Sequence, residues 1–271
     1  MQRLRGLVLA LCLPLVACGA TQEAASNPLQ YAEDAKRAYE KALLPYFDND
    51  WEEANLQMTE VKRKYGYSRY ARLAELRLAD IAYHQEKYAE AVAAYKGFVH
   101  DYPNDPEVPY ARYKVAKSQF EQTSMSLLLP PLEERDLAAV QDAYSSIREH
   151  LTDYPGYQHE PELRHMLEVV TGLLARHELY VGRFYLSEDR FEAAAARVEY
   201  ALHNLVDSGL EAEALVLLGE IRLKMHREDE ARSLFRQVVA MHPASPFVVP
   251  ARQFLRFLTR TDTRAPMDSP R

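Results

Sequence analysis

A frame of apolar residues recurs five times along this chain and constrains its fold more than any other feature. In the copy at 88–103, an aromatic residue is followed by alanine at +3, by large apolar residues at +7 and +10, and by Tyr-Pro at +14 and +15. The other copies depart from this pattern at one or a few positions, and all keep the alanine. Their spacings are 37, 52, 51 and 37 residues, and the anchors are Ala54, Ala91, Ala143, Ala194 and Ala231.

The frame has the geometry of one helix in a packed pair. Positions +3, +7 and +10 fall on one stripe of a helix, where alanine allows close approach of a partner helix. The proline at +15 ends the helix because it lacks the N–H that the next turn needs. A second apolar-periodic segment, such as 70–84, precedes each frame, and no convincing strand alternation is present.

A helix pair in every ~34 residues is the tetratricopeptide unit. Such a unit cannot bury its apolar face alone, so neighbouring units share one continuous core. The sequence therefore predicts an all-α, tetratricopeptide-like helical-hairpin solenoid of about five repeats over 31–258, wound as a right-handed superhelix. A plain helical bundle, which shows similar stripes, is the alternative fold.

Two spacings of the frame exceed 50 residues and need extra chain. Before Ala143 lies the Ser/Leu/Pro-rich segment 123–135, which we interpret as a loop on the third unit. The spacing of 51 indicates either long helices or a longer connection near 157–161.

The N-terminus has the pattern of a bacterial lipoprotein signal. Arg3 and Arg5 precede an uncharged, apolar run of the length of a signal-peptide core, too short to span a bilayer. The run ends at 15–19 in Leu-Val-Ala-Cys-Gly, which resembles a lipobox. We expect a signal peptide at 1–17, lipidation with palmitate-type chains at Cys18, a flexible lipidated tether at 18–30 and a disordered tail at 259–271. An ordinary signal peptide or an uncleaved anchor is the alternative.

Removal of the signal peptide changes the net charge and the cysteine content of the mature chain. Loss of 1–17 removes two arginines and no acid, so the mature net charge becomes −9 in place of −7, which argues against nucleic-acid binding. Cys12 leaves with the signal and Cys18 is lipidated, so the mature chain can form neither a disulfide nor a cysteine-based metal site. By resemblance to lipoprotein sorting in enteric bacteria, Gly19 after the cysteine favours the outer membrane.

No catalytic motif is present, and we expect no catalytic residue, no cofactor and no metal. A zinc site requires about three converging ligands. We do not expect one at His159-Glu160 with His165, because the loop with Pro161 argues against a rigid face, nor at the pair His177-Glu178. An internal hydrogen bond or salt bridge is the simpler interpretation of His177-Glu178.

Arginines seven residues apart share a helix face. Arg176 and Arg183 form one such pair, and Arg190 and Arg197 another. They predict either a basic strip for an acidic partner or internal pairing with the many glutamates. Tyrosines in the second and third units can pack between helices or line a groove for an aromatic-ended peptide: Tyr70, Tyr83, Tyr95, Tyr102, Tyr110 and Tyr113.

Three segments resemble the BamD (ComL) family of lipoproteins that assemble outer-membrane β-barrels. The most specific is the run 174–186, followed by Phe191, Ala194 and Arg197; the others are 51–54 and 98–106. Departures include Tyr65-Gly66 in place of Tyr-Pro and the insert at 123–135.

The resemblance implies a lipid-anchored scaffold on the periplasmic face of the outer membrane. Its partners would be a BamA-like barrel subunit docking on the C-terminal units, other assembly-complex lipoproteins, and unfolded outer-membrane proteins near the N-terminal units. It also suggests partner contacts at Arg197, Arg183, Glu178 and Tyr185.

Two alternative functions remain open. A pilotin-type repeat lipoprotein for secretin or type IV pilus assembly would show near-uniform 34-residue spacing, whereas two spacings here exceed 50. A periplasmic enzyme or hydrolase helper would need a pocket of converging ionisable groups.

Overall fold

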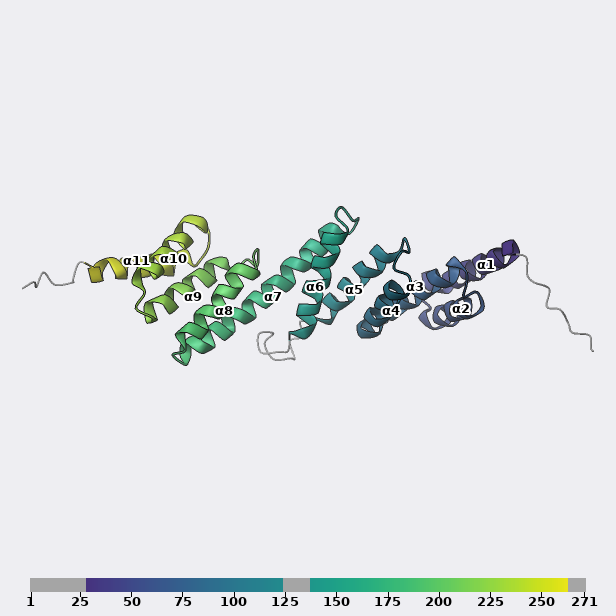
Figure 1. Cartoon of the computed structure of the whole chain (residues 1–271), viewed down its shortest axis with the longest axis horizontal. Helices are drawn as coiled ribbons and strands as arrows, with labels where there is room; N and C mark the ends of the chain where they lie inside the picture. Colours follow the sequence, from purple (N-terminus) through teal and green to yellow (C-terminus); the bar gives the residue numbers. More distant parts are fainter. Residues whose placement is uncertain (1–27, 124–136, 263–271) are drawn as a thin grey trace, which may run out of the picture.

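The computed structural model describes residues 28–123 and 137–262, and within these ranges all regular structure is α-helical. In these ranges, eleven helices follow one another along a single elongated stack, with the first and last helices at opposite ends (Figure 1). They are α1 (Pro28–Phe47), α2 (Trp51–Lys64), α3 (Arg69–His84), α4 (Tyr88–Asp101), α5 (Val108–Gln122), α6 (Ala138–Asp153), α7 (Glu160–Ser187), α8 (Phe191–Asn204), α9 (Glu211–Lys224), α10 (Glu228–Met241) and α11 (Val248–Asp262).

The helices form five pairs, α1–α2 to α9–α10, and α11 closes the C-terminal end. Each helix packs against the next one in the chain, and first helices of neighbouring pairs also touch, as α1 does with α3 and α7 with α9. This is the packing of a hairpin solenoid, so the predicted all-α architecture of about five repeats is confirmed. The handedness of the superhelix stays a prediction.

The recurring frame is the core of the second helix in each pair. All five anchor alanines are completely buried, and so are the five residues at +7, namely Met58, Tyr95, Ile147, Val198 and Phe235. The third copy differs at +10, where His150 is 1% exposed in a position that Val61, Phe98 and Val238 fill in other pairs. Where Tyr-Pro or His-Pro follows, the second helix ends at the residue before it, as α4 ends at Asp101.

A tight turn joins the two helices of each described pair. Asn49, Glu86, Asp189 and His226 each precede the second helix by two residues and have φ between 55° and 60°. This left-handed conformation is uncommon for residues other than glycine. The turn of the third pair lies outside the described residues, together with 124–135 of the predicted loop.

Helix α7 explains the spacing of 51 residues. It is 28 residues long, whereas α8, α9 and α10 have 14 each. Of the two sequence-based alternatives, the long helix is therefore correct.

Both ends of the predicted 31–258 domain extend further as helix. Helix α1 begins at Pro28, inside the predicted tether at 18–30, because proline suits the first turn of a helix. Helix α11 continues past Leu258, its last buried apolar residue, into the predicted tail at 259–271; Thr259 Oγ1 donates to the Leu255 carbonyl over 2.9 Å. The predicted signal peptide and Cys18 lie outside the described residues. No helix in the described ranges is both long and apolar enough to span a bilayer.

Candidate partner-binding site

Two of the four residues implicated by the family resemblance lie together in the fourth pair. Glu178 comes from α7 and Arg197 from α8, and Nη1 of Arg197 donates to Oε2 of Glu178 over 3.3 Å. The Arg197 side chain remains 48% exposed, whereas that of Glu178 is 14% exposed. The guanidinium of Arg197 therefore keeps about half of its side-chain surface accessible to a partner while it is held by Glu178.

A cavity of about 590 Å³ surrounds this ion pair. It lies between α6, α7 and α8 and is polar over much of its wall, with the half-exposed ring of Tyr200 on one side. We refer to it as the unit-four groove, and its lining residues include Tyr144, Arg148, His177, Glu178, Arg197, Tyr200 and Asn204.

The length of α7 accounts for this groove. Helices α6 and α8 both pack on α7, but 28 residues leave room between them. A second cavity of about 550 Å³ shares Tyr144, Arg148 and Asn204 with the first, so the hollow continues along α7. Arg148 donates to the Tyr144 hydroxyl over 3.0 Å, and no carboxylate of the described residues pairs with it. The groove thus offers a second guanidinium beside that of Arg197.

The other two implicated residues have partners of their own. Arg183 on α7 forms an ion pair with Glu213 of α9, which ties the fourth pair to the fifth. The half-buried ring of Tyr185 lies under the guanidinium of Arg190, 4.8 Å from the ring centroid. Internal pairing, one of the two sequence-based alternatives, therefore holds for Arg183 and for Arg197. The four residues do not form a single site.

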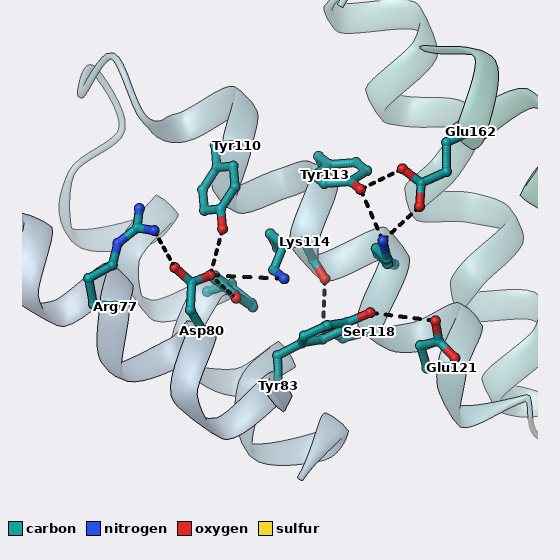
Figure 2. A network of polar contacts seen from close by, with 11 residues as sticks. Arg77, Asp80, Tyr83, Tyr110, Tyr113, Lys114, Ser118, Glu121 and Glu162 are labelled. Carbon is teal, nitrogen blue, oxygen red and sulfur yellow. Dashed lines mark hydrogen bonds and ion pairs between the residues drawn. The ribbon is translucent and has the colours of Figure 1, made fainter. Parts of the chain in front are cut away.

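A buried polar cluster in the second and third pairs was not predicted (Figure 2). Its centre is Asp80 on α3, which is 0% exposed. The hydroxyls of Tyr95 and Tyr110 donate to Asp80 Oδ1 over 2.5 and 2.7 Å, and Arg77 Nη1 lies 2.7 Å from Oδ2. These contacts join α3, α4 and α5. We call this group, with Lys114, the Asp80 cluster.

Lys114 of α5 lies at the edge of this cluster and is only 7% exposed. Its Nζ is 4.0 Å from Asp80 Oδ1 and 3.5 Å from the centroid of the Tyr83 ring. Burial lowers the pKa of Lys114 to about 8, and the nearby carboxylate of Asp80 only partly opposes that shift.

A second set of polar contacts continues from α5 to α7. The Tyr113 hydroxyl donates to Glu162 Oε2 over 2.7 Å, and Lys117 Nζ lies 2.7 Å from Oε1 of the same carboxylate (Figure 2). Partial burial alone would raise the pKa of Glu162, but the contacts from Lys117 and Tyr113 outweigh it and lower the pKa. The polar contacts therefore run from the second pair to the fourth.

These clusters bring ionisable groups together, as the active site of a periplasmic enzyme would. Their side chains, however, pair with one another between packed helices. Asp80 is fully buried, with Oδ1 accepting from Tyr95 and Tyr110 and Oδ2 lying beside the Arg77 guanidinium, so the carboxylate is out of reach of a bound substrate. Among residues 28–123 and 137–262, no three His, Cys, Asp or Glu side chains are placed to hold a metal ion.

Only some residues of the Asp80 cluster could be predicted from the sequence. The tyrosines of the second and third units were recognised, and most of them are packed between helices as expected. Asp80 and Lys114 were missed because each occupies an inward-facing position on an otherwise apolar stripe. Apart from Arg77, which lies three residues from Asp80, their partners lie 15 to 34 residues away in the chain, which no local pattern reveals.

Comparison with known families places the chain among outer-membrane lipoproteins. The family described as "YfiO: Outer membrane lipoprotein" matches residues 31–236. The protein "Outer membrane protein assembly factor BamD" of Xylella fastidiosa (strain Temecula1) is 26% identical over 211 residues, which are 76% of this chain and 72% of that protein.

Proteins of the same name from two other bacteria are also similar. That of Caulobacter vibrioides is 30% identical over 183 residues, 68% of this chain and 58% of the relative. That of Neisseria gonorrhoeae is 24% identical over 252 residues, 91% of this chain and 94% of the relative.

Two solved structures are weakly similar to the chain. The structure described as "TPR2AB-domain:pHSP90-complex of yeast Sti1" is 11% identical with a TM-score of 0.46, and the match covers 84% of both chains. A tetratricopeptide repeat protein from Parabacteroides merdae is 15% identical with a TM-score of 0.27, over 84% of this chain and 99% of that one. At these scores the likeness carries no argument, and the fold rests on the helix pairs themselves.

Proposed function

The chain belongs to the YfiO (BamD) family of outer-membrane lipoproteins, and from that premise we propose that it is a lipid-anchored, periplasm-facing scaffold of the β-barrel assembly machinery. It acts by binding alone. Its partners are a BamA-like barrel subunit, other lipoproteins of the complex and unfolded outer-membrane proteins. Lipid on Cys18 holds it to the membrane, because two or more acyl chains anchor a protein firmly where one does not.

The unit-four groove is the observation that best supports docking of the barrel subunit. It presents the exposed guanidinium of Arg197, held only by a surface ion pair, and the guanidinium of Arg148 with no carboxylate partner among the described residues. Planar guanidinium groups bind carboxylates through two parallel hydrogen bonds. We therefore assign to this groove an acidic surface of the barrel subunit's periplasmic domains.

Binding of purified components tests this assignment. The mature lipidated protein in mild detergent would be titrated with the soluble periplasmic part of its BamA-like partner. We expect Arg197→Glu to weaken the complex at least tenfold, because loss of an interfacial charge pair and like-charge repulsion together cost more than ~1.4 kcal/mol.

Arg63→Glu is the matched control. Arg63 lies in the first pair, forms an ion pair with Glu60 of the same helix at 2.8 Å, and its side chain is 72% exposed. It should leave affinity unchanged. Equal affinity of the wild type and Arg197→Glu, with the helical circular dichroism intact, would remove the unit-four groove from the interface.

The first two pairs supply a different surface, which we assign to unfolded substrates. Trp51 stacks on His84 at 4.8 Å, and Tyr83 and Tyr88 lie beside them at 5.5 Å from each other. Exposed or half-exposed rings of this kind bind apolar and aromatic side chains of an extended chain. Family membership favours this reading over the pilotin alternative, for which no observation here is specific.

A further inference from the structure

Charge is divided sharply along the chain in and after the first helix pair. From residue 42 to residue 61 there are five acidic and no basic residues, and from 62 to 72 there are five basic and no acidic residues. The acidic stretch includes the turn between α1 and α2, whereas the basic stretch includes the end of α2 and the start of α3. We call the basic stretch the basic end, and its cations are Lys62, Arg63, Lys64, Arg69 and Arg72.

Helix α1 begins beside the basic end. The rings of Tyr31, in the first turn of α1, and Tyr65, directly after α2, lie 5.5 Å apart. Figure 1 shows the start of α1 at the outermost end of the stack. Cys18 precedes Pro28, the first residue of α1, by ten residues, which span at most ~35 Å whatever their conformation. A lipid on Cys18 would therefore hold the start of α1 within that distance of the membrane surface.

Two of the five cations are not neutralised by a carboxylate. Lys64 lies 5.2 Å from the centroid of the Tyr65 ring and Arg69 lies 5.5 Å from that of Tyr70, and within 28–123 and 137–262 neither forms an ion pair. Both side chains are exposed. The other three cations are paired at 2.8–3.0 Å, as Lys62–Glu75, Arg63–Glu60 and Arg72–Asp105.

The acids at the start of α1 do not cancel this excess. Asp34 is paired with Arg37 at 2.8 Å. Glu33 is exposed and comes two residues after Tyr31, so it lies on the side of α1 away from the Tyr65 contact. The basic end therefore presents two cations to solvent, although the chain as a whole has a net charge of −7.

Uncovered apolar side chains accompany the two cations. Tyr67, which lies between Lys64 and Arg69 in the chain, is 100% exposed, and Leu29 in the first turn of α1 is 76% exposed. Lysine and arginine together with tyrosine and leucine are typical of protein surfaces at a membrane interface. There the cations pair with headgroup phosphates, and the tyrosine ring lies at the level of the headgroups.

We propose that the basic end binds the anionic phospholipid headgroups of the membrane that holds the lipid on Cys18. Lys64 and Arg69 contact headgroup phosphates, and the side chains of Tyr67 and Leu29 enter the interface beside them. The inference rests on the proposed function, because it takes Cys18 to carry the lipid. The lipid keeps the protein at the membrane, and the basic end fixes which part of the stack lies on the surface.

The test measures how close each end of the stack lies to the lipid in vesicles that carry the mature lipidated protein. Cys18 is the only cysteine of the mature chain, so one introduced cysteine can be labelled with a fluorophore. Gly66→Cys reports the basic end, where an added Cβ meets only the Lys62 carbonyl oxygen, at 3.7 Å. Val249→Cys, at a 62% exposed position of α11, reports the opposite end. Lipids with a nitroxide on the headgroup quench a label that lies at the surface.

In vesicles rich in phosphatidylglycerol, we expect the label at 66 to be quenched at least threefold more strongly than the label at 249. The two labels should be quenched equally in phosphatidylcholine vesicles, and also in about 1 M salt, where the Debye length is ~3 Å. The double reversal Lys64→Glu with Arg69→Glu should equalise them at low salt.

Lys87→Glu with Lys96→Glu is the matched control. It changes the net charge by the same amount at two exposed lysines of the second pair, which form no ion pair among the described residues. This variant should keep the threefold difference. Thermal unfolding of each variant shows whether it has folded, and the comparison of the two lipids needs no charge variant.

The outcomes separate headgroup binding from lipid anchoring. If the protein stays on phosphatidylglycerol vesicles but both labels are quenched equally, the basic end is not a membrane contact, and the lipid anchor stands. The same holds if the folded double reversal keeps the threefold difference, or if phosphatidylcholine gives that difference too. If the lipidated protein does not remain on either kind of vesicle, the anchoring part of the proposed function fails together with this inference.

Discussion

The buried histidine of the third pair introduces a titratable group into an apolar frame. His150 Nε2 lies 3.0 Å from the Pro109 carbonyl, which can only accept, so this nitrogen carries the proton. Its Nδ1 is buried without a hydrogen-bond partner. Burial is the main cause that lowers the pKa of His150 below 6.5. The neutral ring is therefore the form that the fold accommodates.

His150 should make stability fall as the pH becomes acidic. Its pKa is lower in the folded than in the unfolded chain, so below pH 6.5 the unfolded chain takes up the proton first. This loss begins near pH 6.5 and ends below the folded pKa. In His150→Leu we expect a loss of about 1 kcal/mol at pH 7.5, from the missing hydrogen bond, and a smaller deficit at pH 5.5.

Urea unfolding at the two pH values measures this difference, and His100→Leu, at an exposed position on α4, is the control. A deficit that is the same at pH 7.5 and pH 5.5 would show that His150 does not titrate with unfolding.

At the scale of residues, the sequence predicts which apolar side chains are buried, but it does not predict which polar side chains contact one another. Ala91, Tyr95 and Phe98 were placed in the core by periodicity alone, because helix geometry is local. The role of Tyr95 as donor to Asp80 was not accessible, since it depends on how two helices dock. Arg197 and Glu178 were singled out by resemblance, and their mutual ion pair was one of two open alternatives.

The second helices approach the first ones closely at two glycines. A Cβ added to Gly219 of α9 would lie 2.5 Å from Cε1 of Phe235, and one added to Gly182 of α7 would lie 2.8 Å from Cγ2 of Val198. Phe235 and Val198 both occupy position +7 of the frame, 16 residues after the glycine. In these two pairs, the large residue at +7 of the second helix therefore packs against a glycine on the first helix.

Gly219→Ala should destabilise the protein by about 1–3 kcal/mol, because the fully buried Phe235 ring also stacks on Phe254 of α11 and cannot shift freely. Gly97→Ala in α4 is the matched control, since its Cβ would meet nothing within 4 Å. Alanine's helix propensity should stabilise that variant by up to ~1 kcal/mol. Chemical denaturation measures both, and equal effects in the two variants would contradict the close packing of α9 against α10.

The long α7 shows what spacing alone can and cannot specify. A spacing of 51 residues required extra chain but was equally compatible with a longer connection. The segment 160–187 forms one continuous helix because its only proline, Pro161, lies in the first turn, where proline is tolerated. Its two glycines, Gly172 and Gly182, do not end the helix. The unit-four groove follows from that length and could not have been predicted before the positions of α6 and α8 on α7 were known.

At the scale of the molecule, the elongated stack separates its two ends. Helix α1, which follows Cys18 in the chain, and helix α11 lie at opposite ends (Figure 1). A lipid at Cys18 would therefore hold the α1 end near the membrane and leave the fourth and fifth pairs to reach other partners. The packed pairs of 28–262 contain no cysteine and do not depend on the anchor for their core.

Cys18→Ala should abolish acylation, since the thioether needs the cysteine sulfur, and leave the helical fold unchanged. Labelling with palmitate and fractionation of membranes measure the two effects. We expect no label and, in any exported and cleaved protein, release from the membrane with unaltered circular dichroism. A variant that lacks lipid, is cleaved and yet stays fully membrane-bound would refute lipid as the tether.

The central claim is that this chain is a subunit of the β-barrel assembly machinery. A mild-detergent pull-down of the tagged, lipidated protein from native membranes, with partners identified and quantified by mass spectrometry, tests it most directly. We predict near-equal recovery of one barrel protein that carries tandem soluble periplasmic domains. Recovery of a secretin or of pilus components in its place would contradict the assignment and favour the pilotin alternative.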